Sequence, residues 1–374
     1  MQFGLLICLL AVFVLVLLMI RPNRLNRSAN SRLALNVSTI FMVVFLYSSI
    51  AYHTYCTRYT DTIRMSSEMA ESKTQGLLYL LGKYDANPLS AIYLYLVSQV
   101  GGIRVLQMIS AALYMGILLY TLLAVGEREG RVALTAGVFY LICLLDLSAP
   151  LDSVRFPLAA VIFCSSILLH YFNNKNISRT LILCTLGCLM HFSLWPIFIL
   201  TLVAFTKKKI VIAIVSIISI LNVYIMRFLE PLISSISPTI AWKMDSYFNY
   251  DSQYYVNIIS RSQIMFSVMV LLFAGVICVY WSYINKSPYS GFLLLVFSYV
   301  IGCFPSPVAF ARMVPLVMIV SVAPLMRLTN YEVDSISKQY GKSTTFIYLL
   351  VLTSFMFLCL ALRCSNTYEP YYIA

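Results

Sequence analysis

Charged side chains are scarce in this 374-residue sequence. Only 11% of its residues are Asp, Glu, Lys or Arg, against about a quarter in soluble globular proteins. Hydrophobic residues make up 61% of the chain and recur in long runs, which is more apolar surface than a soluble core would bury. We therefore expect a protein that crosses a membrane many times and carries no soluble domain.

Several motifs with known chemistry are also missing. The sequence has no phosphate-binding Walker motif, no zinc-binding motif and no serine nucleophile elbow. These absences argue against nucleotide hydrolysis, and we expect neither a metal nor a cofactor. The net charge of +12 is no sign of nucleic acid, because no basic run is interleaved with aromatics. Much of it falls in short loops, as the positive-inside rule predicts.

Cysteine is present but scattered. Most of the ten cysteines fall in predicted spans, where we interpret them as small packed hydrophobes. Cys184 and Cys188 share a helix face, but two thiols without further ligands make a weak metal site. Cys56 and Cys364 are predicted on the same outer side, so a disulfide between them is an open alternative.

The apolar runs predict an all-α polytopic membrane protein over residues 1–374, as a single transmembrane domain. We count ten full crossings plus a short hairpin, or about twelve hydrophobic segments. No basic side chain precedes the first span and several arginines follow it, which predicts an outer N-terminus. Two longer outer loops are expected, over residues 53–88 and 227–262.

The segment 180–209 allows two interpretations. One long helix would place the three lysines at 207–209 outside, whereas two short helices hinged near His191–Pro196 would return them inside. The hairpin is preferred, because Pro196 weakens helical hydrogen bonding and outer lysines are disfavoured.

Arginine dominates the basic residues predicted outside, whereas lysine is about as common as arginine inside. The guanidinium fork binds phosphate oxygens in pairs better than an ammonium does. The bias therefore predicts an anionic, phosphorylated ligand at the outer face. The outer arginines are Arg58, Arg64, Arg104, Arg155, Arg227, Arg261, Arg312 and Arg363.

Two of these arginines stand at the mouths of predicted spans. Arg155 follows Asp152 and precedes Pro157 at a helix start, so it is either an interfacial anchor paired with Asp152 or a phosphate ligand. Arg312 follows a Pro-Ser-Pro turn with no acid nearby in the sequence, which favours a binding role. Arg58, Arg64 and Arg261 join them as candidate substrate-binding residues.

Candidate catalytic groups are few. His191 lies within a hydrophobic segment, where it is either bonded to a backbone carbonyl or acts as a base or donor toward a sugar. Asp61, Glu68 and Glu71 in the first outer loop are candidate bases, although loop carboxylates are often simply solvated. The second outer loop carries aromatics suited to sugar stacking, Tyr247 among them, although such residues also line membrane interfaces.

At these residues the sequence resembles the Wzy and EpsG type of bacterial polysaccharide polymerase. The resemblance covers roughly residues 30–330. It rests on the arginine-led helix 155–169, the His191-Phe192-Ser193 end of the next segment, the span led by Arg312, and the outer loop around Asp61. Two positions depart from the pattern. Arg155 is followed by Phe156 where such proteins often have Gln, and Asp61 by Thr62 where they often have Tyr.

The resemblance implies a glycosyltransferase at the periplasmic face of the bacterial inner membrane. Such an enzyme joins undecaprenyl-diphosphate-linked repeat units into O-antigen, capsule or exopolysaccharide. Its partners would be those lipid-linked glycans and membrane lipid, with a chain-length regulator protein as a further candidate and no nucleic acid. Arg155 and Arg312 would hold the diphosphate, and His191 or a loop carboxylate would take the acceptor proton.

Three other functions stay open. A ligase would move glycan onto another lipid, and a flippase or transporter would carry the glycolipid or another anion across the membrane. A transporter is expected to hold charges at mid-membrane with access from both sides, whereas the charges here gather outside. A purely structural scaffold does not account for the arginine bias.

Overall fold

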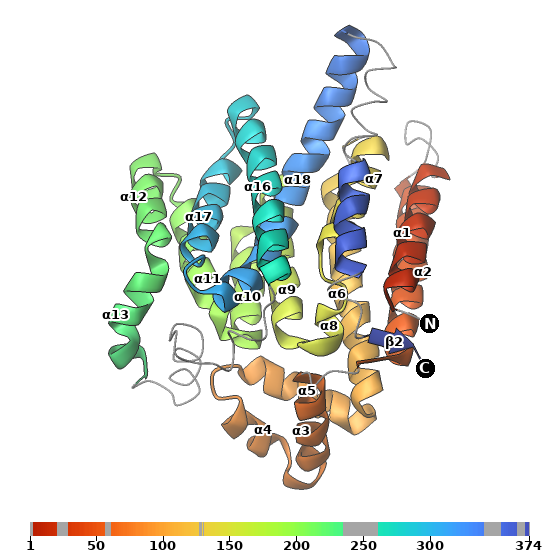
Figure 1. The fold of residues 1–374 in the computed structure, drawn as a ribbon, viewed down its shortest axis with the longest axis vertical. Coiled ribbons are helices and arrows are strands. Elements are labelled where there is room, and N and C mark those ends of the chain that lie inside the picture. Colours follow the sequence, from red (N-terminus) through yellow and green to blue (C-terminus); the bar gives the residue numbers. More distant parts are fainter. Residues whose placement is uncertain are drawn as a thin grey trace.

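A computed structural model describes residues 3–20, 29–56, 61–126, 129, 131–234, 261–339, 353–364 and 371–373. These residues are almost entirely helical, and most of the helices run side by side in a bundle (Figure 1). The predicted all-α polytopic class is confirmed. Among the described residues, five helices are long and apolar enough to cross a membrane, and seven apolar helices are shorter. A sixth span is counted if a bent helix pair crosses once.

The described elements follow one another in chain order. They are α1 Phe3–Ile20, α2 Ala29–His53, β1 Thr54–Cys56, α3 Asp61–Gln75, α4 Leu77–Lys83, α5 Pro88–Val100, α6 Ile103–Val125, α7 Arg131–Leu144, α8 Ala149–Asp152, α9 Arg155–Asn173, α10 Ile177–Met190, the 3-10 turn η3 Phe192–Leu194, α11 Trp195–Phe205, α12 Lys209–Ile220, α13 Asn222–Ser234, α16 Arg261–Ile284, α17 Tyr289–Gly302, α18 Pro307–Gln339, the apolar helix Thr353–Cys364 and β2 Tyr371–Ile373.

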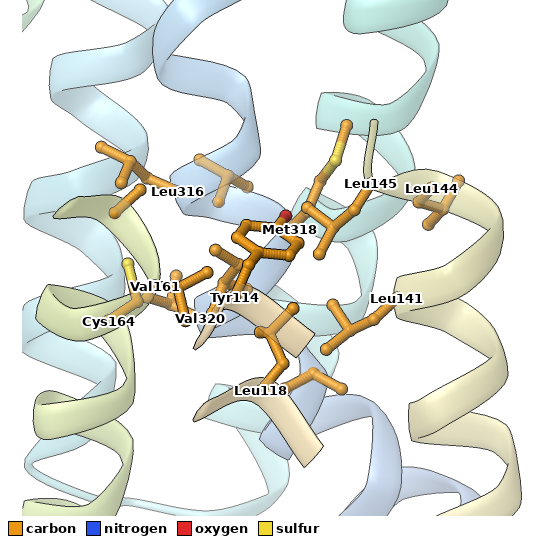
Figure 2. Close-up of a cluster of buried hydrophobic side chains, with 14 of the residues drawn as sticks. Tyr114, Leu118, Leu141, Leu144, Leu145, Val161, Cys164, Leu316, Met318 and Val320 are labelled. Carbon is orange, nitrogen blue, oxygen red and sulfur yellow. The ribbon is translucent and has the colours of Figure 1, made fainter. Parts of the chain in front are cut away.

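The core of the bundle lies where α6, α7, α9 and α18 meet. Figure 2 shows Tyr114 and Leu118 of α6 facing Leu141 of α7, Val161 of α9 and Met318 of α18. All five side chains are at most 3% exposed. Because lipid is as apolar as these residues, close packing rather than water exclusion holds such helices together. The core therefore fixes α9, whose first residue is Arg155.

The predicted hairpin is present. The carbonyl of Met190, at the end of α10, accepts a hydrogen bond from Ser90 Oγ at 2.5 Å, close to the start of α5. The next helix, α11, ends at Phe205, whose ring lies 5.0 Å from that of His170 near the end of α9. The chain therefore reverses at His191–Leu194, so α11 returns to the end of the bundle at which α10 began.

The apolar stretch 210–226 does not form one continuous helix. The chain forms α12 and α13 there, which meet at a 75° bend. A Cβ on Gly302 of α17 would lie 2.2 Å from the Ser219 carbonyl oxygen, so only glycine permits this contact. Asn222 Nδ2 donates to the Tyr299 carbonyl oxygen at 2.7 Å. Contacts with α17 thus secure both sides of the break, the condition under which irregular backbone is tolerated at membrane depth.

The first predicted outer loop is largely helical, because residues 61–83 form α3 and α4 and the helix α5 begins at Pro88. These three helices pack together across one end of the bundle, at the bottom of Figure 1. We call this end the α3–α5 face. Both termini lie towards the same end, where β1 pairs antiparallel with β2 and sets Thr54 opposite Ile373. Most of the second predicted loop, residues 235–260, lies outside the described residues.

Candidate functional site

Arg155 is the first residue of α9 and contacts Asp61 of α3 and Tyr84 of the α4–α5 connection, with 7% of its surface exposed. The preceding residue, Val154, has a φ of 21°, which is rare for a β-branched side chain and turns the chain sharply into the helix. An arginine at a helix N-terminus faces the positive end of the helix dipole. Other groups must therefore stabilise its charge, and α3 and the α4–α5 connection supply them.

The ring of Tyr84 is one such group. The Arg155 Cζ lies 4.7 Å from the ring centroid, a cation–π contact within a largely desolvated setting. Tyr84 donates its hydroxyl hydrogen to Glu68 Oε2. Burial raises the pKa of Tyr84 well above 10, although attraction to Arg155 opposes the shift. The phenol therefore stays a protonated donor across the physiological range.

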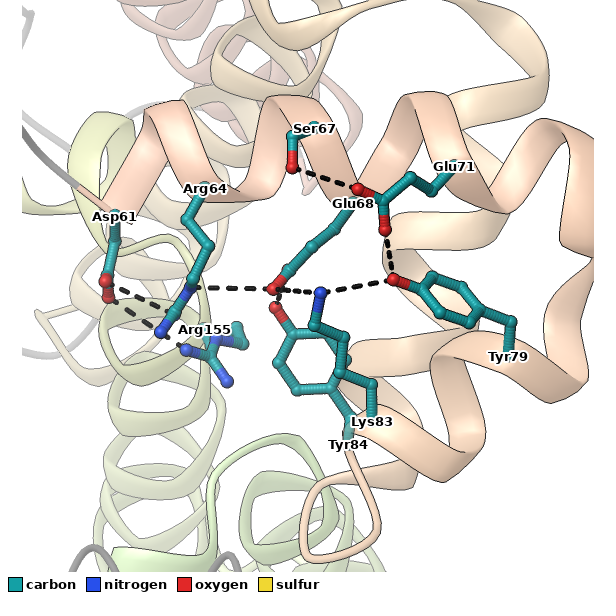
Figure 3. A network of polar contacts seen from close by, with 9 residues as sticks. All are labelled: Asp61, Arg64, Ser67, Glu68, Glu71, Tyr79, Lys83, Tyr84 and Arg155. Atoms are coloured by element: carbon teal, nitrogen blue, oxygen red, sulfur yellow. Dashed lines mark hydrogen bonds and ion pairs between the residues drawn. The ribbon is translucent and has the colours of Figure 1, made fainter.

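Glu68 is the centre of the polar network (Figure 3). Its side chain is 2% exposed, yet its Oε1 atom lies 3.3 Å from Lys83 Nζ and 3.6 Å from Arg64 Nε. Burial alone would lower the pKa of Lys83, but its hydrogen bond to Tyr79 and its attraction to Glu68 raise it overall. A buried carboxylate is stable only with such partners. Glu68 thus connects α3 through Tyr84 to Arg155.

Asp61 bridges two guanidinium groups at the edge of this network. Its Oδ1 atom lies 3.2 Å from Arg64 Nη2, and its Oδ2 atom lies 4.0 Å from Arg155 Nη2. The Asp61 side chain is 39% exposed, whereas that of Arg155 is 9% exposed. The Asp61 carboxylate is therefore the more solvent-exposed member of this ion pair.

Asp152, the predicted partner of Arg155, accepts a hydrogen bond from Thr62. The Thr62 hydroxyl lies 3.4 Å from Asp152 Oδ1 and 3.0 Å from the Leu151 carbonyl oxygen. Gln107 Nε2 donates to the same Leu151 carbonyl at 3.2 Å. These bonds fasten the start of α3 to α8, and so hold Asp61 next to Arg155.

His191 lies beside the same helix end. It is 5% exposed, and its ring meets that of Phe156 edge-on with centroids 5.3 Å apart. The Ser193 backbone N–H donates to His191 Nδ1 at 3.4 Å, and the Ser193 hydroxyl lies 2.7 Å from the same atom. Because Nδ1 accepts, a neutral ring carries its proton on Nε2. Asn87 Oδ1 accepts from Phe192 N at 2.7 Å and ties this turn to α5.

The other predicted site residues lie in several places. It brings Arg312, half-buried in the second turn of α18, to the end of the bundle that holds Arg155. Glu71 accepts from the Tyr79 hydroxyl at the rim of the network. The residue Arg58, the aromatic Tyr247 and the side chain of Arg261 all lie outside the described part of the chain.

Sequence reasoning missed Tyr84 and Lys83, which lie in a stretch read as loop. One signal was available, because Met65, Glu68 and Met69 recur at helical spacing and predict an amphipathic helix with Glu68 on its apolar side. A carboxylate at such a position requires buried partners. Only the fold shows that Tyr84 supplies one of them.

The cluster is chemically suited to an anion. Arg155 Nε is buried without a hydrogen-bond partner in the described structure, so its fork has donor capacity left. Arg64 and Lys83 add positive charge to the same network, part of which Glu68 and Asp61 offset. Nowhere among the described residues do three or more His, Cys, Asp or Glu side chains gather in a way that would hold a metal ion.

Comparison with known proteins then gives the family. No curated protein and no solved structure matches the chain. The family model described as the EpsG family matches residues 52–372, which include β1, the whole α3–α5 face and Arg155. The predicted resemblance is confirmed. The chain belongs to the EpsG family, and this membership indicates a multi-pass membrane protein of the polysaccharide-polymerase type.

Proposed function

We propose that this protein is a glycosyltransferase that polymerises undecaprenyl-diphosphate-linked oligosaccharide repeat units at the periplasmic face of a bacterial inner membrane. One observation carries the proposal beyond the family. A buried arginine with an open N–H is held against Tyr84 and beside Asp61, at the end of an apolar bundle. A guanidinium so placed suits a diphosphate whose lipid tail stays in the membrane.

In this reaction a hydroxyl oxygen of the incoming unit attacks the anomeric carbon of the growing chain. The bond from that carbon to the diphosphate oxygen breaks, and the lipid diphosphate leaves with the bonding electrons. Arg155, with Arg64 and Arg312 as further candidates, would stabilise the charge that develops on the leaving group. The bond energy is already stored in the diphosphate, so the reaction needs no nucleotide.

The acceptor hydroxyl must also lose a proton. Asp61 is favoured as the base, because its carboxylate is the more exposed candidate and lies beside Arg155. His191, whose Nδ1 accepts from the Ser193 backbone N–H, stays the alternative base or hydrogen-bond donor. A chain-length regulator protein stays a predicted partner.

The proposal is tested in a strain that lacks this gene. The strain is complemented with wild type, Arg155→Ala, Arg312→Ala or Arg179→Ala at matched expression, and surface-glycan length is read on a gel. Arg179 is the control, because it is exposed near the start of α10, at the opposite end of the bundle. We expect single repeat units in the deletion strain, and a full ladder with wild type and Arg179→Ala only. Repeat units trapped on the cytoplasmic side would instead indicate a flippase and refute the enzyme.

A further inference from the structure

Two thiols from the first and last described helices meet near the termini. Cys8 lies in the second turn of α1, and Cys364 is the final residue of the helix Thr353–Cys364. Their Sγ atoms are 3.7 Å apart, although 356 positions separate them in sequence. We propose that Cys8 and Cys364 form a disulfide in the mature protein, which makes this pair a modification site.

The backbone already brings the two residues together. Gly4 and Cys8 are one helical turn apart and so share a face of α1. A Cβ added to Gly4 would lie 3.2 Å from Cys364 Cβ and 3.5 Å from its Cα, so the last helix packs closely on this face. Bond formation requires the sulfur atoms to approach by about 1.7 Å, to the usual length near 2.05 Å. Rotation of the two side chains is the motion we expect to close this gap.

Exposure separates this pair from the other cysteines of the described chain. Cys8 and Cys364 are partly exposed, whereas the remaining seven free cysteines with described side chains are buried. A soluble oxidant needs such access. The disulfide left open by the sequence, Cys56 to Cys364, has a competitor in Cys8, whose sulfur is in contact with that of Cys364. The side chain of Cys56 lies outside the described residues.

The pair belongs to the end of the bundle that carries the candidate site. The strand β2, next after Cys364 in the described chain, pairs with β1, which leads to α3. If this end faces the periplasm, as the proposed function requires, the thiols meet an oxidising compartment. The inference therefore rests on that proposed orientation.

The chemistry needs an oxidant of the disulfide class. One cysteine thiolate attacks the oxidant's disulfide and displaces one of its sulfurs as a thiol, forming a mixed disulfide. The second cysteine attacks the protein sulfur of that mixed disulfide and releases the oxidant's other thiol. Two electrons and two protons pass to the oxidant, and one S–S bond joins α1 to the last helix. The family match begins at residue 52, so the bond would fasten a helix outside that match to the matched region.

Two measurements on the full-length protein test the inference. In the first, purified protein is oxidised with glutathione disulfide, and peptides are searched by mass spectrometry for a Cys8–Cys364 link. In the second, cells are quenched with N-ethylmaleimide before lysis, and the same link is sought. Wild type is compared with Cys8→Ser, Cys364→Ser and, as a matched control, Cys56→Ser.

We expect the link in wild type and Cys56→Ser under both conditions, and its loss in Cys8→Ser and Cys364→Ser. Failure to form with purified, correctly folded protein overturns the proposed pairing and leaves the polymerase proposal standing. A Cys8–Cys364 link that forms in the purified protein but never in cells refutes the proposal that the disulfide forms in vivo, and it counts against the periplasmic orientation. A Cys56–Cys364 link in wild type assigns the bond to the other pair and refutes the inference.

Discussion

Glu68 is expected to stabilise the α3–α5 face mainly through one hydrogen bond. The bond from the buried Tyr84 hydroxyl to the ionised carboxylate contributes about 1.5–3 kcal/mol. Arg64 and Lys83 are 35% and 40% exposed, so solvent screening limits each ion pair to about 0.2–1 kcal/mol. Glu68→Ala should therefore lower the free energy of opening this face by about 2–5 kcal/mol.

A double-mutant cycle with Tyr84→Phe isolates the dominant bond. Either single variant removes it, so the double variant should fall short of the summed effects by about 1.5–3 kcal/mol. Hydrogen exchange at the amides of α3, α4 and α5 in the purified protein reports this opening. Glu71→Ala with Tyr84→Phe is the matched control, because Glu71 bonds Tyr79 instead, and should be additive. Additivity of Glu68→Ala with Tyr84→Phe would refute the assigned network.

Three further predictions test the site and the fold. Arg155→Lys keeps the positive charge but loses the planar guanidinium. Glycan polymerisation should therefore fall roughly 100-fold, as it does when an oxyanion-hole donor is removed. A wild-type glycan ladder in this variant would contradict the role of the guanidinium. Gly302→Ala sets its Cβ 2.2 Å from the Ser219 carbonyl oxygen and should destabilise the protein by about 1–3 kcal/mol, seen as a lower melting temperature. Gly82→Ala, whose Cβ meets nothing within 4 Å, is the control. The pKa of Lys83 in the folded protein is raised above its ordinary value of 10.5. Hydrogen-exchange protection of α4 should therefore be constant from neutral pH to about 10.5 and fall only as the pH rises further. Loss of this protection below pH 9 would count against the ion pair of Lys83 with Glu68.

Much of the membrane architecture follows from local pattern. Long apolar runs predict helices without reference to their neighbours, because a backbone in lipid must satisfy its hydrogen bonds within each segment. The hairpin at His191–Leu194 was also predictable, since Pro196 and the lysines at 207–209 both oppose a single long helix. The bend between α12 and α13 was not, because it depends on Gly302 and Tyr299 of a helix far along the chain.

The candidate site was likewise predictable from the sequence only in part. Three candidate residues could be predicted from the sequence, because polar side chains near apolar spans are energetically costly. They are Arg155, Asp61 and His191. Their grouping is visible only in the fold, as are the roles of Tyr84 and Lys83. Closeness in sequence does not identify every partner of Arg155. Asp152, three positions before it, accepts a hydrogen bond from Thr62, whereas Asp61 approaches the guanidinium from another helix.

The sequence by itself determined that this protein is helical, lies in a membrane and resembles the family to which it belongs. These properties depend on composition and on short-range periodicity, which the order of residues records directly. The tertiary structure alone decided that Glu68 holds Tyr84, that Tyr84 supports Arg155, and that Cys8 meets Cys364. Each of these contacts joins residues from different helices, so its existence depends on how the helices pack.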